Sequence, residues 1–552
     1  MAQVQDVFVS PAVDWWVLVP QIILVGAALG LLLVASLAPR ALPDWVSTVV
    51  SIATGAAAAI VAAVQWGMWG STPRPTLAGA FVSDGFSLLL TVLVGAGVVM
   101  TALVAHSALD RYDMAPPEFA ALLLASAAGA VVMAGANDLI VLFLGLESLS
   151  IALYVLIALA GRRASARESA MKYFVLGAFS SAFFLYGIAL VYGSTGGTNL
   201  SGVGGFLFDS LRYDNDYLSL ETDYLLLAGI ALLLVGLGFK VAAVPFHFWA
   251  PDVYEGAPSP VTGYLASIAK AAGFAALARV LYVAVAEQST AWAPILIGLA
   301  FATLAVGAVM AICQNDVKRM LAYSSISHAG FVLVGLSAVP AAGELGQWVV
   351  RVGGAAPVVL EMGDGNDAVS SAVFYLIAYS FMALGSFAVL SALAPEQQSA
   401  DAGAGGADPP SPHALSRYSG LARRRPVLAL AFTVLLLAQA GVPFTAGFWA
   451  KLGVILAAVD ARGYVLPAVA MATAAVSAFA YLRVVLAMYA PEGQADADES
   501  APAARASRPR WGGLPLTSVV AISLAVGVTV VVGVFPQRLL EWSADAVLSI
   551  IL

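Results

Sequence analysis

The chain of 552 residues is 61% hydrophobic and only 11% charged, which excludes an ordinary soluble protein of this length and indicates a polytopic membrane protein. Its single cysteine, Cys313, excludes disulfides within the chain and any iron–sulfur cluster held by several cysteines. The four histidines have no metal-ligand spacing and no glycine-rich nucleotide loop is present, so we expect no metal, cofactor or nucleic acid bound to this chain; the net charge of -8 says little about partners.

Fourteen apolar runs long enough to cross a membrane as helices follow one another along the chain. A membrane-spanning helix needs about 20 residues, and these runs are too long to be barrel strands. The first 16 residues contain no Lys or Arg, so we interpret the first run as a retained span rather than a secretory signal. The predicted spans are 14–36, 44–68, 85–106, 118–135, 138–160, 170–192, 223–250, 259–286, 291–312, 319–339, 369–394, 427–457, 463–490 and 515–536. The tail at 537–552 is predicted to be an interfacial helix.

The distribution of basic residues predicts the orientation of these spans. With the N-terminus outside, the odd-numbered loops face the cytoplasm and hold 15 of the 25 Lys and Arg residues, whereas the outside loops hold five. Cytoplasmic loops carry the excess of positive charge in membrane proteins. We therefore predict an all-α integral membrane protein with about 14 transmembrane helices and an outside N-terminus.

An internal repeat occupies the middle of the chain. The motif VPFHFW at 244–249 recurs as VPFTAGFW at 442–449, each time late in a long apolar span. Five spans separate the two prolines, so the second copy enters the membrane from the opposite side, as in transporters built from two inverted five-helix repeats with broken helices. In this interpretation residues 1–552 form one transmembrane domain, divided into 1–117 (the first three helices), 118–286 (repeat 1), 291–490 (repeat 2), 491–514 (a flexible cytoplasmic loop) and 515–552 (the last helix and tail). The low-complexity stretch 395–412 is predicted to be a second flexible connector.

Ionisable residues within the predicted spans are the candidates for function. A charge in the hydrocarbon core of a membrane is costly unless a partner, water or a function accounts for it. The residues in question are Glu147, Lys240, Lys270, Arg279, Lys451 and Arg483.

The first group of candidates surrounds Lys240. Glu147, Ser150 and Tyr154 occur at i, i+3 and i+7, which places them on one polar stripe of an otherwise apolar helix. Pro245 cannot donate a hydrogen bond to the carbonyl four residues earlier, so we expect a wet gap in the helix beside Lys240. Burial disfavours the charged lysine and a nearby Glu147 carboxylate favours it, so Lys240 is expected to gain and lose a proton.

The second group lies further along the chain. Lys270, in LASIAKAAGF, has Ser267 at i-3 on the same helix. In the second repeat Pro443 is expected to free the carbonyl of Gln439, and Lys451 follows about two turns later. We expect the hydroxyl groups of Ser150, Tyr154 and Ser267 to hold water along a route for protons.

Each candidate also has a purely structural interpretation. Glu147 and Lys240 form a static ion pair in this alternative, although burying such a pair seldom adds stability. His328, in LAYSSISHAGF, is either bonded to a neighbouring hydroxyl or functional. Asp84, in VSDGF, lies at a span end and is interpreted as interfacial, and the two arginines within spans are interpreted as snorkelling from helix ends.

Four stretches of the sequence closely resemble one family, the antiporter-like subunits of respiratory complex I. They are LFLGLESLSIALYVL, GFKVAAVPFHFWAPDVYEGAPSPVTGYLASIAKAAGF, QNDVKRMLAYSSISHAGF and GVPFTAGFWAKLGV. The resemblance extends from about Leu139 to Tyr489. Within the family, PDVYEGAPSP is most similar to the subunit N branch of bacterial NADH:quinone oxidoreductase.

The resemblance implies roles for individual residues. Glu147 matches the family's fifth-helix glutamate that faces a seventh-helix lysine, here Lys240. Lys270 matches the eighth-helix lysine that links two half-channels, and Lys451 matches the twelfth-helix lysine of the exit half-channel. His328 matches a histidine on the central polar axis. The repeats disagree in lysine register, because Lys240 precedes its proline by five residues and Lys451 follows its proline by eight.

The resemblance also implies an activity and partners. The chain is expected to move protons through buried glutamate and lysine half-channels as a subunit of an NADH:quinone oxidoreductase in the bacterial plasma membrane, with no redox site of its own. FMN, iron–sulfur clusters and the quinone site are expected in partner subunits, and lipid around this one. Two alternatives remain: a subunit of a free-standing cation/proton antiporter, and a structural membrane subunit.

Overall fold

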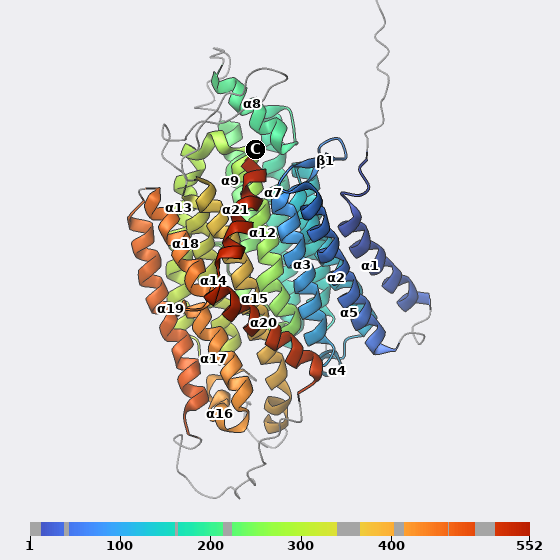
Figure 1. The fold of residues 1–552 in the computed structure, drawn as a ribbon, viewed down its shortest axis with the longest axis vertical. Helices are drawn as coiled ribbons and strands as arrows, with labels where there is room; N and C mark the ends of the chain where they lie inside the picture. Colours follow the sequence, from blue (N-terminus) through green and yellow to red (C-terminus); the bar gives the residue numbers. More distant parts are fainter. Residues whose placement is uncertain are drawn as a thin grey trace, which may run out of the picture.

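The computed structural model describes residues 13–37, 43–160, 164–212, 224–338, 365–401, 413–461, 463–491 and 514–551. In this part of the chain the fold is a bundle of helices with one short β-hairpin (Figure 1). Residues 395–401, predicted as the start of a flexible connector, instead continue the helix α15 through Pro395. The rest of that connector and most of the predicted loop at 491–514 lie outside the described residues.

The bundle has two chemically different ends. We call the end that carries the hairpin the hairpin end; it lies at the top of Figure 1, and the opposite end, with Arg111, Lys172 and Arg319, is the basic end. The elements of the first three spans are α1 (Val19–Leu37), α2 (Asp44–Trp69), β1 (Arg74–Thr76), β2 (Phe81–Ser83), α3 (Gly85–Ala105) and α4 (Leu109–Tyr112). The strands β1 and β2 pair antiparallel between α2 and α3.

The region of the first predicted repeat contains two interrupted spans. Its elements are α5 (Pro116–Gly135), α6 (Leu139–Ala158), α7 (Ala164–Thr195), α8 (Leu200–Arg212), α9 (Tyr224–Val241), α10 (Trp249–Gly256), α11 (Ser259–Tyr264), η2 (Leu265–Ala269), α12 (Lys270–Arg279) and η3 (Val280–Ala284). The segments η2 and η3 are π-helical turns that bound α12 on both sides.

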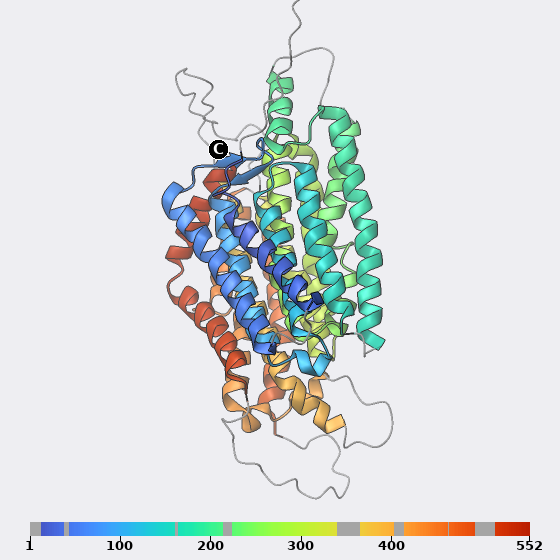
Figure 2. The same cartoon turned by 90° about the vertical axis from the view of Figure 1, so that its right-hand side faces the viewer.

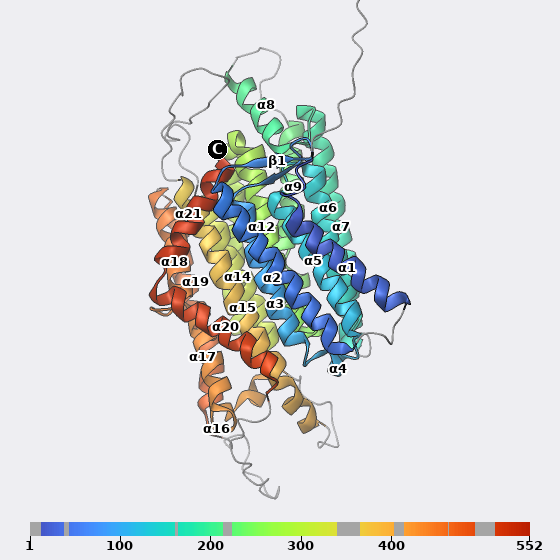
Figure 3. The same cartoon turned by 45° about the vertical axis from the view of Figure 1, so that its right-hand side comes forward.

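The region of the second repeat and the C-terminal segment complete the bundle. Their elements are η4 (Ala286–Gln288), α13 (Ser289–Ile312), α14 (Val317–Ser337), α15 (Gly365–Asp401), η5 (Leu415–Tyr418), α16 (Leu421–Arg424), α17 (Pro426–Ala440), α18 (Ala446–Asp460), α19 (Val465–Tyr489), α20 (Leu516–Val534) and α21 (Gln537–Ile551). The predicted tail helix is present as α21. Figures 2 and 3 show α20 and α21 running beside α3 and α15, with which both helices are in contact.

The number of spans agrees with the prediction once the broken helices are considered. Thirteen helices in the described part of the chain are long and apolar enough to cross a membrane. The remaining predicted span, 427–457, is divided into α17 and α18, each of 15 residues. At the centre of the bundle α14 is buried along its length, whereas α1 at the periphery is mostly exposed.

A repeated local motif supports the inverted repeat. The dipeptide Asn137–Asp138 precedes α6, and Asn315–Asp316 precedes α14; both aspartates cap their helix with a side-chain oxygen. Each dipeptide also pairs, antiparallel, with the chain that follows the next helix. The first motif lies against the hairpin through Gly79, whereas the second lies at the basic end. The helices α6 and α14 therefore start from opposite ends of the bundle.

Candidate functional site

The two broken spans are interrupted by the same type of helix end. The residue after α9 is Ala242 with φ 58°, and the residue after α17 is Gly441 with φ 91°. In both, backbone N–H groups of the turn bond back to carbonyls of the last helical turn, as in a Schellman motif. The breaks therefore begin before the prolines that predicted them: Pro245 and Pro443 lie within the connecting turns. Each proline thus lies within a helix break, as predicted, but the preceding helix ends before the proline is reached.

Lys240 lies in the last turn of α9 and is buried. Its ammonium donates to the Ser150 hydroxyl of α6 at 2.8 Å and to the Tyr173 hydroxyl of α7 at 3.4 Å. Glu147, half-buried one turn before Ser150, instead accepts a hydrogen bond from the hydroxyl of Ser181. The structure thus brings Glu147, Ser150 and Lys240 together as predicted, without a direct bond between carboxylate and ammonium.

A small cavity lies beside Lys240, Ser150 and Ser181. It has a volume of about 10 Å³, and Tyr154 also lines it. A cavity of this size holds about one water molecule where polar groups surround it. The hydroxyl of Ser181 bonds Glu147 and that of Ser150 bonds Lys240. One water molecule in this cavity can therefore complete a polar connection between the two charged groups.

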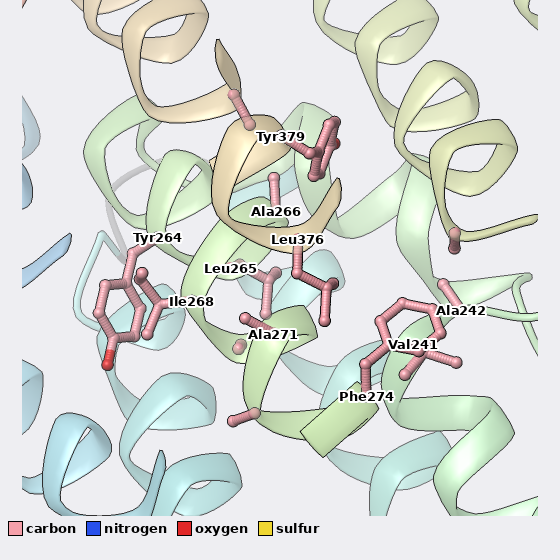
Figure 4. Close-up of a cluster of buried hydrophobic side chains, with 14 of the residues drawn as sticks. Val241, Ala242, Tyr264, Leu265, Ala266, Ile268, Ala271, Phe274, Leu376 and Tyr379 are labelled. Atoms are coloured by element: carbon pink, nitrogen blue, oxygen red, sulfur yellow. The ribbon is translucent and has the colours of Figure 1, made fainter. Parts of the chain in front are cut away.

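Lys270 begins α12 immediately after the π-helical segment η2. Its ammonium donates to the backbone carbonyl of Ser325 in α14 at 2.8 Å. Figure 4 shows the apolar side chains that surround this part of the bundle, among them Phe274 beside Val241. Ser267, predicted to hold water, donates its hydroxyl to its own helix at the Gly263 carbonyl, 2.6 Å away. The surroundings of Lys270 are therefore mainly apolar, with a backbone oxygen as its partner.

Lys451 reaches the equivalent place in the second repeat from the other side of the break. It belongs to α18, and its ammonium donates to the carbonyl of Ala440, the last residue of α17, at 2.9 Å. The ammonium also lies 5.0 Å from the ring centroid of Phe331. Carbonyl groups at a helix C-terminus carry partial negative charge and stabilise a cation. Lys240 and Lys451 thus both lie at the C-terminal end of a first half-helix, which accounts for their different positions relative to the prolines.

His328 lies inside α14 and is bonded on both sides of its ring. Nδ1 lies 2.6 Å from the Tyr375 hydroxyl and Nε2 lies 3.0 Å from the Tyr481 hydroxyl. The ring also lies 4.5 Å from that of Tyr379. The hydroxyl partners agree with the structural interpretation of this histidine. Its place on α14, the helix whose Ser325 carbonyl binds Lys270 and whose Phe331 lies against Lys451, agrees with the functional one.

The sequence interpretation missed a buried ion pair. Asp84 and Arg279 are joined through both carboxylate oxygens at 2.8 and 2.7 Å, and their side chains are only 2% and 3% exposed. Arg279 also donates to the Ala134 carbonyl and lies over the ring of Phe86. Asp84 lies at the N-terminal end of α3, as expected, but it is buried within the protein. The expectation that Arg279 snorkels is wrong, because α3, α5 and α12 pack around its ion pair. The capping box that Asp84 forms with Ser87 is a sequence signal for the aspartate's position, but not for its partner.

Arg483 is accounted for by a helix end. Its guanidinium donates to the carbonyls of Ile312 and Gln314 and to the side chain of Asn315, where α13 ends. A cation at this position is stabilised by the helix dipole. The contacts of Arg483 are thus with the end of a neighbouring helix, and its predicted snorkelling stays a prediction.

An ion cluster at the basic end holds the short helix α10. Asp252 accepts from Lys172 of α7 at 2.7 Å and from Arg319 of α14 at 2.8 Å, and Arg319 also bonds Glu255 at 2.7 Å. Burial raises the pKa of Asp252, but the hydrogen bonds from its two cationic partners outweigh this and hold the pKa below its ordinary value. The second half of the first broken span is thereby tied to two neighbouring helices.

The comparisons with known proteins identify the family. The family described as NADH:quinone oxidoreductase/Mrp antiporter, transmembrane, matches residues 136–349 and 354–479. The NADH-quinone oxidoreductase subunit N 2 of Roseiflexus castenholzii is 40% identical, over 88% of this chain and 89% of the relative. The subunit N of Salinispora arenicola is 39% identical, over 97% of this chain and 98% of the relative. The chain belongs to the subunit N family of NADH-quinone oxidoreductases.

A solved structure agrees with this membership of the subunit N family. A chain of respiratory complex I from Thermus thermophilus with bound aureothin is 31% identical, with a TM-score of 0.70 and coverage of 95% of this chain and 98% of that chain. Five candidate residues lie within the ranges that match the family: Glu147, Lys240, Lys270, His328 and Lys451. The chain is thus an antiporter-like membrane subunit, and its polar centre lies in the part shared with its relatives.

Proposed function

We propose that this chain translocates protons across the bacterial plasma membrane as a membrane-arm subunit of an NADH:quinone oxidoreductase, with its N-terminus outside. Its 39–40% identity to proteins named subunit N and its likeness to a chain of complex I support this assignment. The excess of Lys and Arg in the odd-numbered loops supports the orientation.

The observation that carries the proposal is a set of three buried lysines without carboxylate partners. Lys240, Lys270 and Lys451 are 3%, 2% and 6% exposed. Within the described residues none of them forms an ion pair, and each donates to neutral oxygens. A buried ammonium without a counter-ion contributes little to stability and is costly in a membrane. Proton exchange accounts for three such groups better than packing does.

The proposed route follows the polar groups of both repeats. Protons pass between Glu147 and Lys240 through the small cavity, and then to Lys270 on the central helix α12. From there they reach His328 and Lys451, which lie in the second repeat. Neutral oxygens beside each lysine stabilise its charged form, and the apolar surroundings favour its neutral form, so both forms are accessible. The order of the steps and the two half-channels are part of this proposal.

The energy is supplied outside this chain. Quinone reduction in partner subunits changes the electrostatic environment at one end of this series of proton sites. The charge at each site then shifts the protonation equilibrium of the next. FMN and iron–sulfur clusters belong to those partners. This chain contributes the sites that hold protons and, between Glu147 and Lys240, a cavity large enough for one water molecule.

The substitution Lys240→Met in the assembled complex tests the proposal. We expect normal assembly and loss of most NADH-driven proton pumping, measured as acidification of inverted membrane vesicles with a protonophore control. Arg279→Met is the matched control, because Arg279 is equally buried but is paired with Asp84 and bonds none of the residues of the proposed route. It is expected to reduce assembly while the assembled fraction pumps normally.

Two other outcomes would favour the alternatives. Normal pumping in Lys240→Met with reduced assembly would assign Lys240 a structural role. Purification of the tagged chain with membrane subunits only, without NADH:quinone activity, would favour a free-standing cation/proton antiporter. In that case sodium and potassium fluxes in proteoliposomes become the measurement.

A further inference from the structure

The second repeat has a neutral residue where the first has its lysine. Lys240 lies two residues before Ala242, the left-handed residue that ends α9, and Gln439 lies two residues before Gly441, which ends α17 in the same way. Gln439 is 2% exposed. A buried amide at the counterpart of a functional lysine raises the question of what it does.

Gln439 lies in a chain of hydrogen bonds that leads to His328. The Ser324 hydroxyl connects the two, because it bonds the Gln439 Oε1 at 3.5 Å and the Tyr481 hydroxyl at short distance. Tyr481 in turn bonds Nε2 of His328 at 3.0 Å. The members of this chain come from three elements, α14, α17 and α19, so it forms only when these helices are packed together.

Gln439 determines which group donates and which accepts in each hydrogen bond of this series. The amide nitrogen of Gln439 donates to the Ser386 hydroxyl at 2.8 Å and to the backbone carbonyl of Leu435 at 3.4 Å. A backbone carbonyl can only accept, so the NH₂ group faces it. Ser386 gives its own hydrogen to the Met382 carbonyl at 2.9 Å and accepts from the amide. The Gln439 oxygen must therefore face Ser324 as an acceptor.

The orientation of the amide determines each later bond. Because the Gln439 oxygen accepts, Ser324 donates to it and has only lone pairs left for its other partner. Tyr481 therefore donates to Ser324 and offers a lone pair to His328. Because the Tyr481 oxygen can only accept from His328, Nε2 of His328 must carry the hydrogen of this bond. In the neutral imidazole the other nitrogen, Nδ1, then carries no hydrogen and accepts from Tyr375.

We propose that Gln439 is a positioning residue that holds His328 as the tautomer with hydrogen on Nε2. The basic nitrogen Nδ1 then faces Tyr375, whose ring stacks on Phe331 at 5.9 Å. Phe331 is also the ring beneath the Lys451 ammonium. Gln439 thus directs the proton-accepting nitrogen of His328 to the Lys451 side of the second repeat. The amide itself does not relay protons, so the hydrogen-bond series does not conduct protons beyond Gln439 to Ser386. The role in translocation rests on the proposed function; the tautomer does not.

The tautomer can be measured by nitrogen-15 NMR on the full chain in lipid, labelled at histidine. His328→Asn identifies the signal of His328 among the four histidines. We expect the Nε2–H tautomer in the wild-type chain. In Gln439→Leu the Ser324 hydroxyl loses its acceptor and can donate to Tyr481, so two nearly equivalent chains exist and about half of His328 should become Nδ1–H. Ser324→Ala breaks the chain at a second point and should have the same effect.

Two further variants separate positioning from a general disturbance. Gln439→Glu keeps an acceptor for Ser324 and should retain the wild-type tautomer. Thr433→Val is the matched control, because Thr433 lies on the same helix and its hydroxyl bonds only the Ala429 carbonyl among the described residues. An Nδ1–H signal in the wild-type chain, or an unchanged tautomer in both Gln439→Leu and Ser324→Ala, overturns the proposal.

Pumping by the assembled complex provides an independent readout. We expect Gln439→Leu to lower the number of protons pumped per NADH while Gln439→Glu retains most of it. If Lys240→Met abolishes pumping but Gln439→Leu changes neither tautomer nor pumping, the inference fails and the proposed function stands. If Gln439→Leu shifts the tautomer while Lys240→Met pumps normally, the proposed function fails and the tautomer assignment stands.

Discussion

Removing one partner of the buried pair Asp84–Arg279 should destabilise the chain strongly. The substitution Asp84→Asn keeps an oxygen that can cap α3 but removes the negative charge from a pair only 2% and 3% exposed. Leaving a buried charge uncompensated costs about 3–5 kcal/mol. Asp84→Ala also removes the helix cap, which adds about 1 kcal/mol. We therefore expect losses of about 3–5 kcal/mol for Asp84→Asn and about 4–6 kcal/mol for Asp84→Ala.

The pair can be separated from its surroundings by a double-mutant cycle. Arg279→Met keeps much of the apolar stem of the side chain that lies over Phe86 and leaves Asp84 unpaired. Combining Asp84→Asn with Arg279→Met removes both charges, so no buried charge is left uncompensated. The double variant should be less destabilised than either single variant, with a coupling free energy of about 2–3 kcal/mol.

The free energies can be measured by denaturant unfolding of the purified chain in mild detergent, followed by circular dichroism. Tryptophan fluorescence provides a second probe that tests two-state behaviour. Losses below about 1 kcal/mol for both single variants, the range of exposed ion pairs, would show that the pair is hydrated. Additive effects in the double variant would show that the two groups do not depend on each other.

The remaining predictions concern the helix breaks and the basic end. Ala242→Gly should stabilise the chain by about 0.5–1 kcal/mol, because glycine adopts the positive φ without strain, and the same unfolding assay measures this. Gly441→Ala should destabilise it by about 1–2 kcal/mol and lower pumping, because φ is 91° and the new Cβ would lie 3.0 Å from Cδ of Lys451; stability equal to wild type would contradict this. The contribution of Asp252 should be present above its ordinary pKa of 3.8 and be lost as the pH falls through its lower folded value, because its pKa is depressed in the folded state. Melting temperatures of the wild type and Asp252→Asn should therefore differ at pH 7 and converge as the pH falls through the depressed pKa of Asp252; a constant difference would refute the assignment.

Much of the fold could be predicted from the sequence because lipid imposes simple rules. Long apolar runs gave the spans, and the basic loops gave a consistent topology. The candidate lysines were found because a charge within such a run is conspicuous. The exact start of the first break was not predictable, since Ala242 takes a left-handed conformation that no sequence pattern indicates, whereas Gly441 is a typical residue after a helix end. The break was expected at the proline, three residues later.

Long-range pairs were the second limit of sequence interpretation. Asp84 and Arg279 are separated by 195 residues, and only the packing of α3 against α12 brings them together. Glu147 was expected near Lys240, but its hydrogen bond from Ser181, on the neighbouring α7, was not predictable from the sequence. The direction of the chain from Gln439 to His328 likewise depends on hydroxyl groups from separate helices, whose distances a sequence cannot give.

The position of Lys451 makes the second break sensitive to movement between its two halves. The ammonium belongs to α18 and its partner carbonyl to α17, so the bond at 2.9 Å spans the joint itself. A small displacement of one half-helix relative to the other lengthens this bond and weakens the stabilisation of the charge by the helix dipole. In the first repeat the lysine and the helix dipole belong to the same half-helix and move together. The environment of Lys451 therefore depends on the relative position of the two half-helices, whereas Lys240 keeps the dipole of its own half-helix when that half-helix moves.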